Sequence, residues 1–246
     1  MENEIAQSEG AFGKPLAKYW MHNGFVNINQ EKMSKSLGNF LLIKDVIQSY
    51  HPEAIRLFLL SSHYRSPIDF TDKTIDEAGT NLDKIYALLD RMEAKLGGPQ
   101  DMISDPDEGV WTQFCEAMDD DFNTARGVGV LFESVRQMNR LLDEAGDRLA
   151  PETEKMLQSG REAILKIGTV LGIMTESPAA YFDKKRSHAL EKESADPAAI
   201  EQLIQERTAA RKAKDWSTAD HIRDQLDAMN VILEDRPDGT VWKMKS

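Results

Sequence analysis

The sequence contains almost no cysteine: one residue, Cys115, among 246. A single thiol excludes an internal disulfide, and it excludes a metal cage built from cysteines of this chain alone. Long apolar runs are also missing, because none approaches the roughly 18 residues that span a bilayer. Residues 1–5 are acidic, whereas a signal peptide begins with basic residues. We therefore expect a cytoplasmic protein in a reducing compartment.

Basic residues are fewer than acidic ones, 30 against 42, and the formal net charge is −12. This sum argues against a nucleic-acid partner, because Lys and Arg contacts to phosphate usually dominate such binding. The charge is uneven, however, with acidic residues concentrated over 101–121 and 191–196. A later segment is locally basic, so a basic face is compatible with the negative sum. Its basic residues are Arg207, Arg211, Lys212, Lys214 and Arg223.

The composition, with 41% hydrophobic and 29% charged residues, is that of a globular protein. Apolar residues over 75–96 recur at alternating steps of three and four, which predicts a helix with one buried face. Thr74 and Glu77 have capping-box spacing at its start. Two further periodic stretches, 128–142 and 156–174, complete an antiparallel bundle of four or five helices.

The segments on either side of this bundle have different patterns. Residues 25–29 alternate apolar and polar, which predicts a short strand that leads into a loop. Proline after His51 indicates a new helix with Pro52 at its first position. Residues 176–196 lose periodicity and are predicted to form a linker. The tail beyond it is predicted to contain helices over 197–214 and 217–229 and then a β-hairpin.

The loop after the predicted strand contains Lys32-Met33-Ser34-Lys35-Ser36, flanked by Glu31 and by residues 37–40. Most short charged segments are solvated loops without a further role. A chance match to all five positions has a probability on the order of one in several thousand, which weighs against that alternative. The segment resembles the second signature of the class I aminoacyl-tRNA synthetases, whose catalytic domain is Rossmann-like. The loop alone does not separate the members for cysteine, methionine, leucine, isoleucine and valine.

The resemblance implies a role for this loop in amino-acid activation by ATP. Negative charge builds on the pyrophosphate as it leaves, and Lys32 and Lys35 would converge on it. Preorganised donors of this kind contribute about 3 kcal/mol each. Ser34 and Ser36 would add hydroxyl contacts to ATP, which would carry Mg²⁺. Lys32 and Lys35 are therefore the predicted catalytic residues.

Four other stretches resemble the cysteinyl-tRNA synthetase family in particular. They cover residues 2–9, 117–124, 210–224 and 233–242, and they occur in the family's order. The resemblance extends over the whole chain, and it implies that this chain corresponds to the C-terminal half of such a synthetase. The family's other nucleotide signature, His-Ile-Gly-His or a close variant, is absent from this sequence. We therefore expect a truncated chain that is inactive by itself.

The resemblance also implies a zinc ion that binds the thiol of L-cysteine, since a soft metal prefers sulfur to oxygen. Glu4 corresponds to one of its ligands, and the others would be two cysteines and a histidine. The histidine would lie four residues earlier, just ahead of Met1. Zinc is therefore expected in the intact enzyme and not in this chain, where Glu4 is more simply a solvated carboxylate at a helix end.

tRNA(Cys) is the partner that the resemblance implies, with the bundle at the inner corner of the tRNA and the tail at the anticodon GCA. Arg211 can hydrogen-bond a guanine edge, and Trp216 can stack on an unpaired base. Asp220 and Asp235 can accept hydrogen bonds from exocyclic amino groups. Ordinary packing is the alternative for both tryptophans, and it is the favoured interpretation for Trp242.

These features predict a mainly α protein with four parts. Residues 1–50 would be the end of a Rossmann-like class I catalytic domain, and residues 51–175 a tRNA-binding helical bundle. Residues 176–196 would link the bundle to a small α+β anticodon-binding module over 197–246.

The hypothesis is a C-terminal part of a cysteine–tRNA ligase, which joins L-cysteine to tRNA(Cys) with ATP. One alternative is a non-catalytic tRNA-binding or regulatory module derived from such an enzyme. A second is the cysteine ligase of mycothiol synthesis, against which the tail argues.

Overall fold

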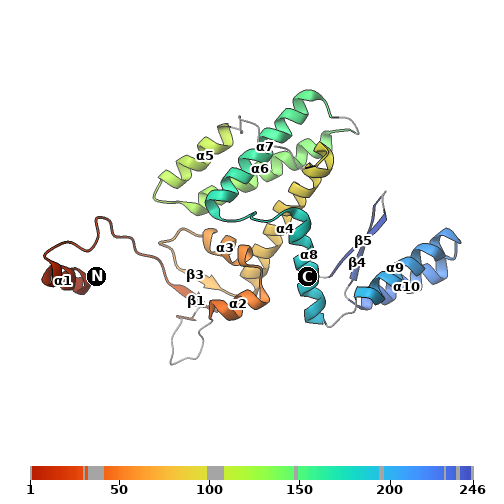
Figure 1. Ribbon diagram of the computed structural model, residues 1–246, viewed down its shortest axis with the longest axis horizontal. Coiled ribbons are helices and arrows are strands. Elements are labelled where there is room, and N and C mark those ends of the chain that lie inside the picture. Colours follow the sequence, from red (N-terminus) through yellow and green to blue (C-terminus); the bar gives the residue numbers. More distant parts are fainter. Residues whose placement is uncertain are drawn as a thin grey trace. The chain divides into compact units, whose positions relative to one another are not determined.

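The computed structural model describes residues 2–29, 31–32, 42–98, 108–146, 149–193, 197–229, 231–236 and 239–244. The chain divides into two compact units, one that ends at Thr175 and one that begins at Glu176. Both are mostly helical, and each contains a small sheet (Figure 1). The predicted mainly α fold is confirmed. In the described part of the chain, no helix combines the length and the apolar character that a membrane crossing requires.

The first unit contains a three-stranded sheet of order β2-β1-β3. The strand predicted over 25–29 is confirmed as β1, which pairs antiparallel with β2 and parallel with β3. In the parallel pair, Val26 lies opposite Ile68. The elements of this region are α1 (Glu2–Phe12), β1 (Val26–Ile28), β2 (Glu31–Lys32), α2 (Ile43–Ser49), α3 (Pro52–Leu60) and β3 (Ile68–Phe70).

Two local signals set the starts of α3 and of α4 (Asp72–Leu96). His51 precedes α3, and its Nδ1 accepts a hydrogen bond from the backbone of Glu53 at 3.3 Å, so the predicted start at Pro52 is confirmed. The capping box of α4 is formed by Thr71 and Thr74, so the predicted capping box of Thr74 and Glu77 is wrong. The helix begins earlier than predicted because the Thr71 hydroxyl accepts from the Thr74 backbone at 3.1 Å.

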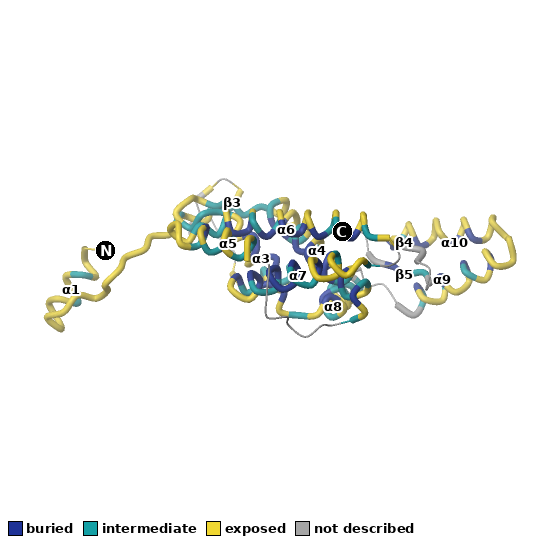
Figure 2. The backbone as a smooth tube through the Cα atoms, turned by 90° about the horizontal axis from the view of Figure 1, so that it is seen from above, coloured by how far each residue is buried: buried dark blue, intermediate teal, exposed yellow. Residues whose placement is uncertain are grey.

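The apolar stripe of α4 is buried against α3, α6 (Thr124–Glu144) and α7 (Pro151–Leu171), and α5 (Glu108–Asp119) packs on α6 and α7, which confirms a helical bundle (Figure 2). The left-handed Gly97, with φ of 83°, ends α4. Close packing of such side chains supplies most of the stability of a helical domain. Fully buried members of this core include Leu82, Ile85, Met92, Leu131, Leu157 and Ile164.

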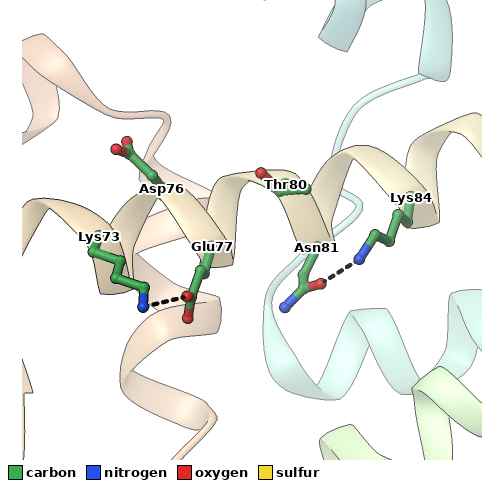
Figure 3. A pocket seen from close by; sticks show the side chains of 6 residues that line it. All are labelled: Lys73, Asp76, Glu77, Thr80, Asn81 and Lys84. Atoms are coloured by element: carbon green, nitrogen blue, oxygen red, sulfur yellow. Dashed lines mark hydrogen bonds and ion pairs between the residues drawn. The ribbon is translucent and has the colours of Figure 1, made fainter.

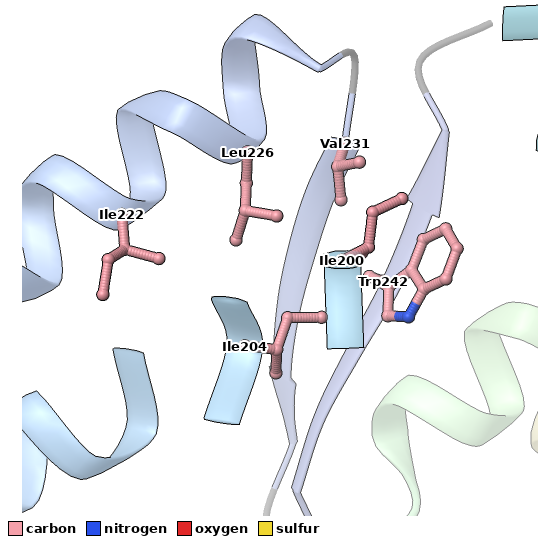
Figure 4. Packing of buried hydrophobic residues seen from close by; sticks show 6 residues of the cluster. All are labelled: Ile200, Ile204, Ile222, Leu226, Val231 and Trp242. Carbon is pink, nitrogen blue, oxygen red and sulfur yellow. The ribbon is translucent and has the colours of Figure 1, made fainter. Parts of the chain in front are cut away.

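The second unit has its own core, formed where two helices pack on a β-hairpin (Figure 4). The predicted tail elements are present as α9 (Pro197–Lys212), α10 (Trp216–Ala228), β4 (Val231–Arg236) and β5 (Gly239–Met244). The two strands pair antiparallel along their length. The buried side chains of the core are Ile200, Ile204, Ile222, Leu226, Val231 and Trp242.

The predicted linker over 176–196 is not an extended linker, because most of it forms the helix α8 (Pro178–Glu193). The segment lacks an apolar period, which is why the pattern of hydrophobic residues gave no helix signal. The helix is rich in Ala, Lys and Glu, which favour helix intrinsically, and it has proline at its first position.

Candidate functional site

The structure places the approach to the Lys-Met-Ser-Lys-Ser segment on a β-hairpin. Asn27 pairs with Lys32, and Ile28 pairs with Glu31. Asn29, with φ of 51°, begins the turn between them. The backbone of Lys32 therefore ends β2 beside β1. The side chain of Lys32 lies outside the described residues, as do Ser34, Lys35 and Ser36 entirely, so their contacts to ATP stay predictions.

Downstream of this segment, α3 carries a buried carboxylate. Glu53 is 6% exposed, and its two oxygens accept four hydrogen bonds. The donors are the hydroxyl of Tyr86 at 2.8 Å, the backbone N–H of Met174 at 3.0 Å, and the backbone and hydroxyl of Thr175 at 2.8 and 2.5 Å. Burial opposes ionisation, but these donors outweigh it and hold the pKa of Glu53 below its ordinary value.

The same helix also contacts the end of α7. The Arg56 guanidinium donates to the carbonyl of Leu171 at 3.4 Å. A Cβ on Gly172, whose φ is +67°, would come within 3.1 Å of that guanidinium. The first turns of α3 therefore fix the point at which the first unit ends. Because donors saturate Glu53, we assign it this structural role and not proton transfer.

Glu4 lies exposed on α1, away from any described group of metal ligands. Structural zinc takes four ligands, and catalytic zinc takes three from the protein. Among the described residues, no cluster of three or more His, Cys, Asp or Glu side chains could hold a metal. The residues present do not fit a zinc site, and no chemistry of this chain is assigned to zinc.

In the second unit, the turn between α9 and α10 brings two of the predicted RNA-binding residues to one corner. Arg211 is exposed in the last turn of α9, and Trp216, 60% exposed, is the first residue of α10. Lys214 adopts a left-handed backbone with φ of 59°. The Asp215 backbone N–H closes the turn by donating to the Ala210 carbonyl at 2.9 Å.

Asp215 also fixes the start of α10. Its carboxylate accepts from the backbone and the hydroxyl of Thr218, at 3.1 and 2.7 Å. These Thr218 donors hold the pKa of Asp215 below its ordinary value, so the group is anionic at neutral pH. Its three-residue spacing from Thr218 is the sequence signal that would have identified it. Asp215 is thus a positioning residue for the neighbouring Trp216.

The two predicted acidic contacts lie on different elements. Asp220 follows Trp216 by one helical turn of α10 and forms an ion pair with Arg223 at 3.4 Å. Asp235 lies on β4 opposite Thr240, and its side chain is outside the described residues. The structure thus gathers Arg211, Trp216 and Asp220 at the α9–α10 corner, and it places Asp235 on the hairpin.

The two tail tryptophans have opposite environments. Trp242 is 6% exposed, and its indole N–H donates to Glu201 at 2.6 Å. The Arg186 guanidinium lies 5.3 Å from its ring centroid. Packing is therefore the role of Trp242, as predicted. Trp216 is instead exposed, and the cations Arg211 and Lys214 lie within five residues of it in the sequence. An exposed aromatic ring near cations is the kind of group that stacks on unpaired bases.

A broad surface depression of about 610 Å³ lies elsewhere, along one face of α4 (Figure 3). One helix alone supplies its lining, and the charged side chains largely compensate each other. Lys73 lies 3.9 Å from Glu77, and Lys84 donates to Asn81 at 3.0 Å. We interpret it as a solvated helix face and not as a ligand site.

Comparison with known proteins gives three family models that match the chain in order. Residues 1–80 match the catalytic domain of class I (C) tRNA synthetases, residues 113–175 match the DALR domain, and residues 194–242 match the cysteinyl-tRNA ligase anticodon-binding domain. Together they cover most of the chain.

Curated relatives agree with these matches. The cysteine–tRNA ligase of Geobacter sulfurreducens is 49% identical over 251 residues, which cover 99% of this chain and 51% of the relative. The cysteine–tRNA ligase of Syntrophotalea carbinolica is 48% identical over 246 residues, which cover 99% of this chain and 51% of that relative. The chain therefore spans about half the length of the curated relatives it matches.

Proposed function

The chain belongs to the cysteinyl-tRNA synthetase family, and we propose that it serves as the tRNA-reading half of a cysteine–tRNA ligase. The complete reaction would join L-cysteine to tRNA(Cys) and convert ATP to AMP and pyrophosphate. This chain would contribute the signature loop, the bundle and the tail module. The rest of the ATP and cysteine site would come from the other half of the enzyme.

The main support for this proposal is the α9–α10 corner, the turn between these helices with Arg211, Trp216 and Asp220. Trp216 is 60% exposed at the first position of α10, and the cap at Asp215 fixes where that helix starts. Base stacking on an aromatic ring and hydrogen bonds from Arg are the main ways in which proteins recognise unpaired RNA bases. We infer that Trp216 stacks on an anticodon base, with Arg211 at a guanine edge and Asp220 and Asp235 at exocyclic amino groups.

The loop would act on the nucleotide in the assembled enzyme. Lys35 and Lys32 would stabilise negative charge on the departing pyrophosphate, together with the Mg²⁺ that accompanies ATP. Ser34 and Ser36 would add hydroxyl contacts to the phosphates. Glu4 would contribute one ligand to a zinc site only if the remaining ligands came from the other half.

Binding of tRNA by the full chain tests the proposal. We expect weak binding of tRNA(Cys) in a filter assay, a lower affinity as the salt concentration rises, and a further loss when the GCA anticodon is replaced. The isolated chain should not catalyse ATP–pyrophosphate exchange. Equal binding of tRNA(Cys) and its anticodon-replaced form would contradict specific reading by the tail.

A second candidate function is a non-catalytic tRNA-binding or regulatory module. The observation in its favour is that the tail has its own hydrophobic core and so needs no catalytic domain to form. Exchange activity after mixing with the other half of the enzyme would argue against a purely non-catalytic role.

A further inference from the structure

The helix α8 belongs to the second unit, which begins at Glu176, and it packs on β5 of the tail hairpin. It lies between two family matches, one that ends at residue 175 and one that begins at residue 194. Leu190 of α8 packs against the hydrophobic core of the tail. Side-chain packing of this kind gives a helix a defined place in its unit. The segment between the two matches is therefore a structural part of the tail.

One tryptophan joins α8 and α9 to the hairpin. The indole N–H of Trp242, on β5, donates to Glu201 of α9 at 2.6 Å, and the Arg186 guanidinium of α8 lies 5.3 Å from the centroid of its ring. The ring is 6% exposed and lies at the end of the hydrophobic cluster opposite to Ile222 (Figure 4). Side chains of two helices thus hold one residue of the hairpin. We call Arg186, Trp242 and Glu201 the Trp242 clasp.

The Trp242 clasp bears on RNA binding because the hairpin carries one of the predicted contacts, Asp235. Trp242 lies opposite Leu233 on β4. Asp235 follows Leu233 by two residues and pairs with Thr240. A two-stranded hairpin is marginally stable by itself, so its place depends on what packs against it. A strand advances about 3.3 Å per residue, so a shift of Trp242 would move the nearby backbone of Asp235 with it.

The other predicted contacts lie on the helices that the Trp242 clasp holds. Glu201 is near the start of α9, and Arg211 is in the last turn of the same helix. The turn that follows leads to Trp216 at the start of α10. A binding site keeps its contacts in fixed places only where supporting side chains hold the elements that carry them. The Trp242 clasp thus ties the hairpin to the helix whose other end forms the α9–α10 corner.

We propose that Arg186 and Glu201 are positioning residues for anticodon recognition. They act through Trp242 and hold the hairpin where Asp235 and the α9–α10 corner can contact one anticodon. The inference rests on the proposed function. The Arg186 guanidinium is engaged by the ring and by Asp183 at 3.6 Å, and its side chain is 34% exposed, which favours this role over a direct contact to phosphate.

Competition binding of the full chain to tRNA(Cys) and to its anticodon-replaced form tests the inference. Arg186→Ala and Glu201→Ala should each lower the preference for the GCA anticodon by about three- to tenfold, the effect expected when one cation–π contact or hydrogen bond is lost. Arg186→Lys keeps a cation beside the ring and should restore part of the preference. A partly unfolded chain would bind both tRNAs less and keep their ratio, so the ratio reports position and not stability.

Matched variants remove the same charge from the same helix outside the Trp242 clasp. Lys184→Ala on α8 breaks an ion pair with Glu176, and Glu206→Ala removes an exposed carboxylate from α9. Both should leave the anticodon preference unchanged within about twofold, as is usual for exposed positions. Equal losses for Arg186→Ala and Lys184→Ala would overturn the proposal, and so would an unchanged preference in Arg186→Ala or Glu201→Ala.

The salt dependence of binding separates positioning from a direct contact. We expect Arg186→Ala to leave the slope of log affinity against log salt concentration unchanged. A contact of Arg186 to phosphate would instead reduce the slope by about 1 and weaken both tRNAs alike, which would overturn the positioning role.

The unaltered chain separates this inference from the proposed function. If it prefers the GCA anticodon and the variants of the Trp242 clasp keep that preference, the inference is wrong and the proposed function stands. If the unaltered chain shows no preference, the tail does not read the anticodon, and both the proposed function and the inference are overturned.

Discussion

The hydroxyl of Tyr86 donates a 2.8 Å hydrogen bond to the carboxylate of Glu53, and both side chains are buried. Tyr86 belongs to the long helix α4, whereas Glu53 lies in the first turn of α3. The same carboxylate accepts the backbone N–H groups of Met174 and Thr175. One ionised side chain thus joins three segments that are far apart in the sequence.

Glu53→Gln should lower the free energy of unfolding of the first unit by about 2–3 kcal/mol, because an amide brings N–H groups toward donors and removes the charge they stabilise. Tyr86→Phe removes one hydrogen bond and should cost about 1 kcal/mol. Urea unfolding followed by circular dichroism measures both. The control is Glu77→Gln on the exposed face of α4, which should cost less than about 0.5 kcal/mol. Equal losses for Glu53→Gln and Glu77→Gln would contradict this assignment.

The stability that Glu53 contributes should depend on pH in one direction. Its pKa is lower in the folded chain than in the unfolded chain, because Thr175, Tyr86 and Met174 donate to the carboxylate and outweigh its burial. The contribution is therefore fully present above the unfolded value of about 4.3, and it is lost as the pH falls through the lower folded pKa. The difference in unfolding free energy between the unaltered chain and Glu53→Gln should be constant near neutral pH and shrink in acid. A difference that grows in acid would refute this sign.

Two glycine substitutions should act in opposite directions. Gly24→Ala should destabilise the first unit by about 1–3 kcal/mol, because its Cβ would meet the Ser66 backbone. Gly79→Ala, inside α4 with open space around the new methyl group, should stabilise by about 0.5–1 kcal/mol. Thermal unfolding of the two variants gives the comparison, and a shift of the same sign for both would be inconsistent with these surroundings.

Trp216→Ala should weaken tRNA(Cys) binding by about 5- to 150-fold, since stacking is worth roughly 1–3 kcal/mol per base. Trp216→Phe should retain part of the affinity. Ile232→Ala, at another partly exposed apolar position of the tail, is the matched control and should change binding less than about twofold. Fluorescence anisotropy with labelled tRNA measures all three. Unchanged binding by Trp216→Ala would remove the main support for the corner as the RNA contact.

Arg211→Lys should reduce selectivity more than affinity. Lysine keeps the positive charge that attracts phosphate, but it lacks the planar donor pair that fits a guanine edge. The preference for the GCA anticodon over a replaced anticodon should fall by roughly 1–3 kcal/mol in competition binding. A uniform loss of affinity for both tRNAs would instead indicate that Arg211 contacts phosphate only.

Periodicity predicted α4 and the bundle because burial of one helix face leaves a regular apolar stripe in the sequence. The start of α3 was predictable from Pro52, which is a local signal. The helix α8 was missed because it lacks such a stripe, so only the intrinsic preferences of its residues favoured it. Likewise, Thr71 lies outside the apolar stripe, so the start of α4 was misplaced.

The Glu53 network could not be read from the sequence, because its partners lie up to 122 residues away and only folding brings them together. The sequence identified both Trp216 and Trp242 as candidates. Which of them is exposed and which is buried depends on tertiary packing, so this difference could not be derived from the sequence pattern. The roles of Lys32, Ser34, Lys35, Ser36 and Asp235 stay predictions, because their side chains lie outside the described residues.

The α9–α10 corner makes the spacing of its residues as important as their identity. Arg211 and Trp216 are separated by a turn in which Lys214 is left-handed and Asp215 closes a hydrogen bond to Ala210. Each residue added to a helix rotates the remainder of that helix by about 100°. A one-residue insertion after Trp216 would keep every side chain of the corner and yet point Asp220 away from the ring. Homologous tails should therefore tolerate exchanges of residue type at this corner far better than changes in its length.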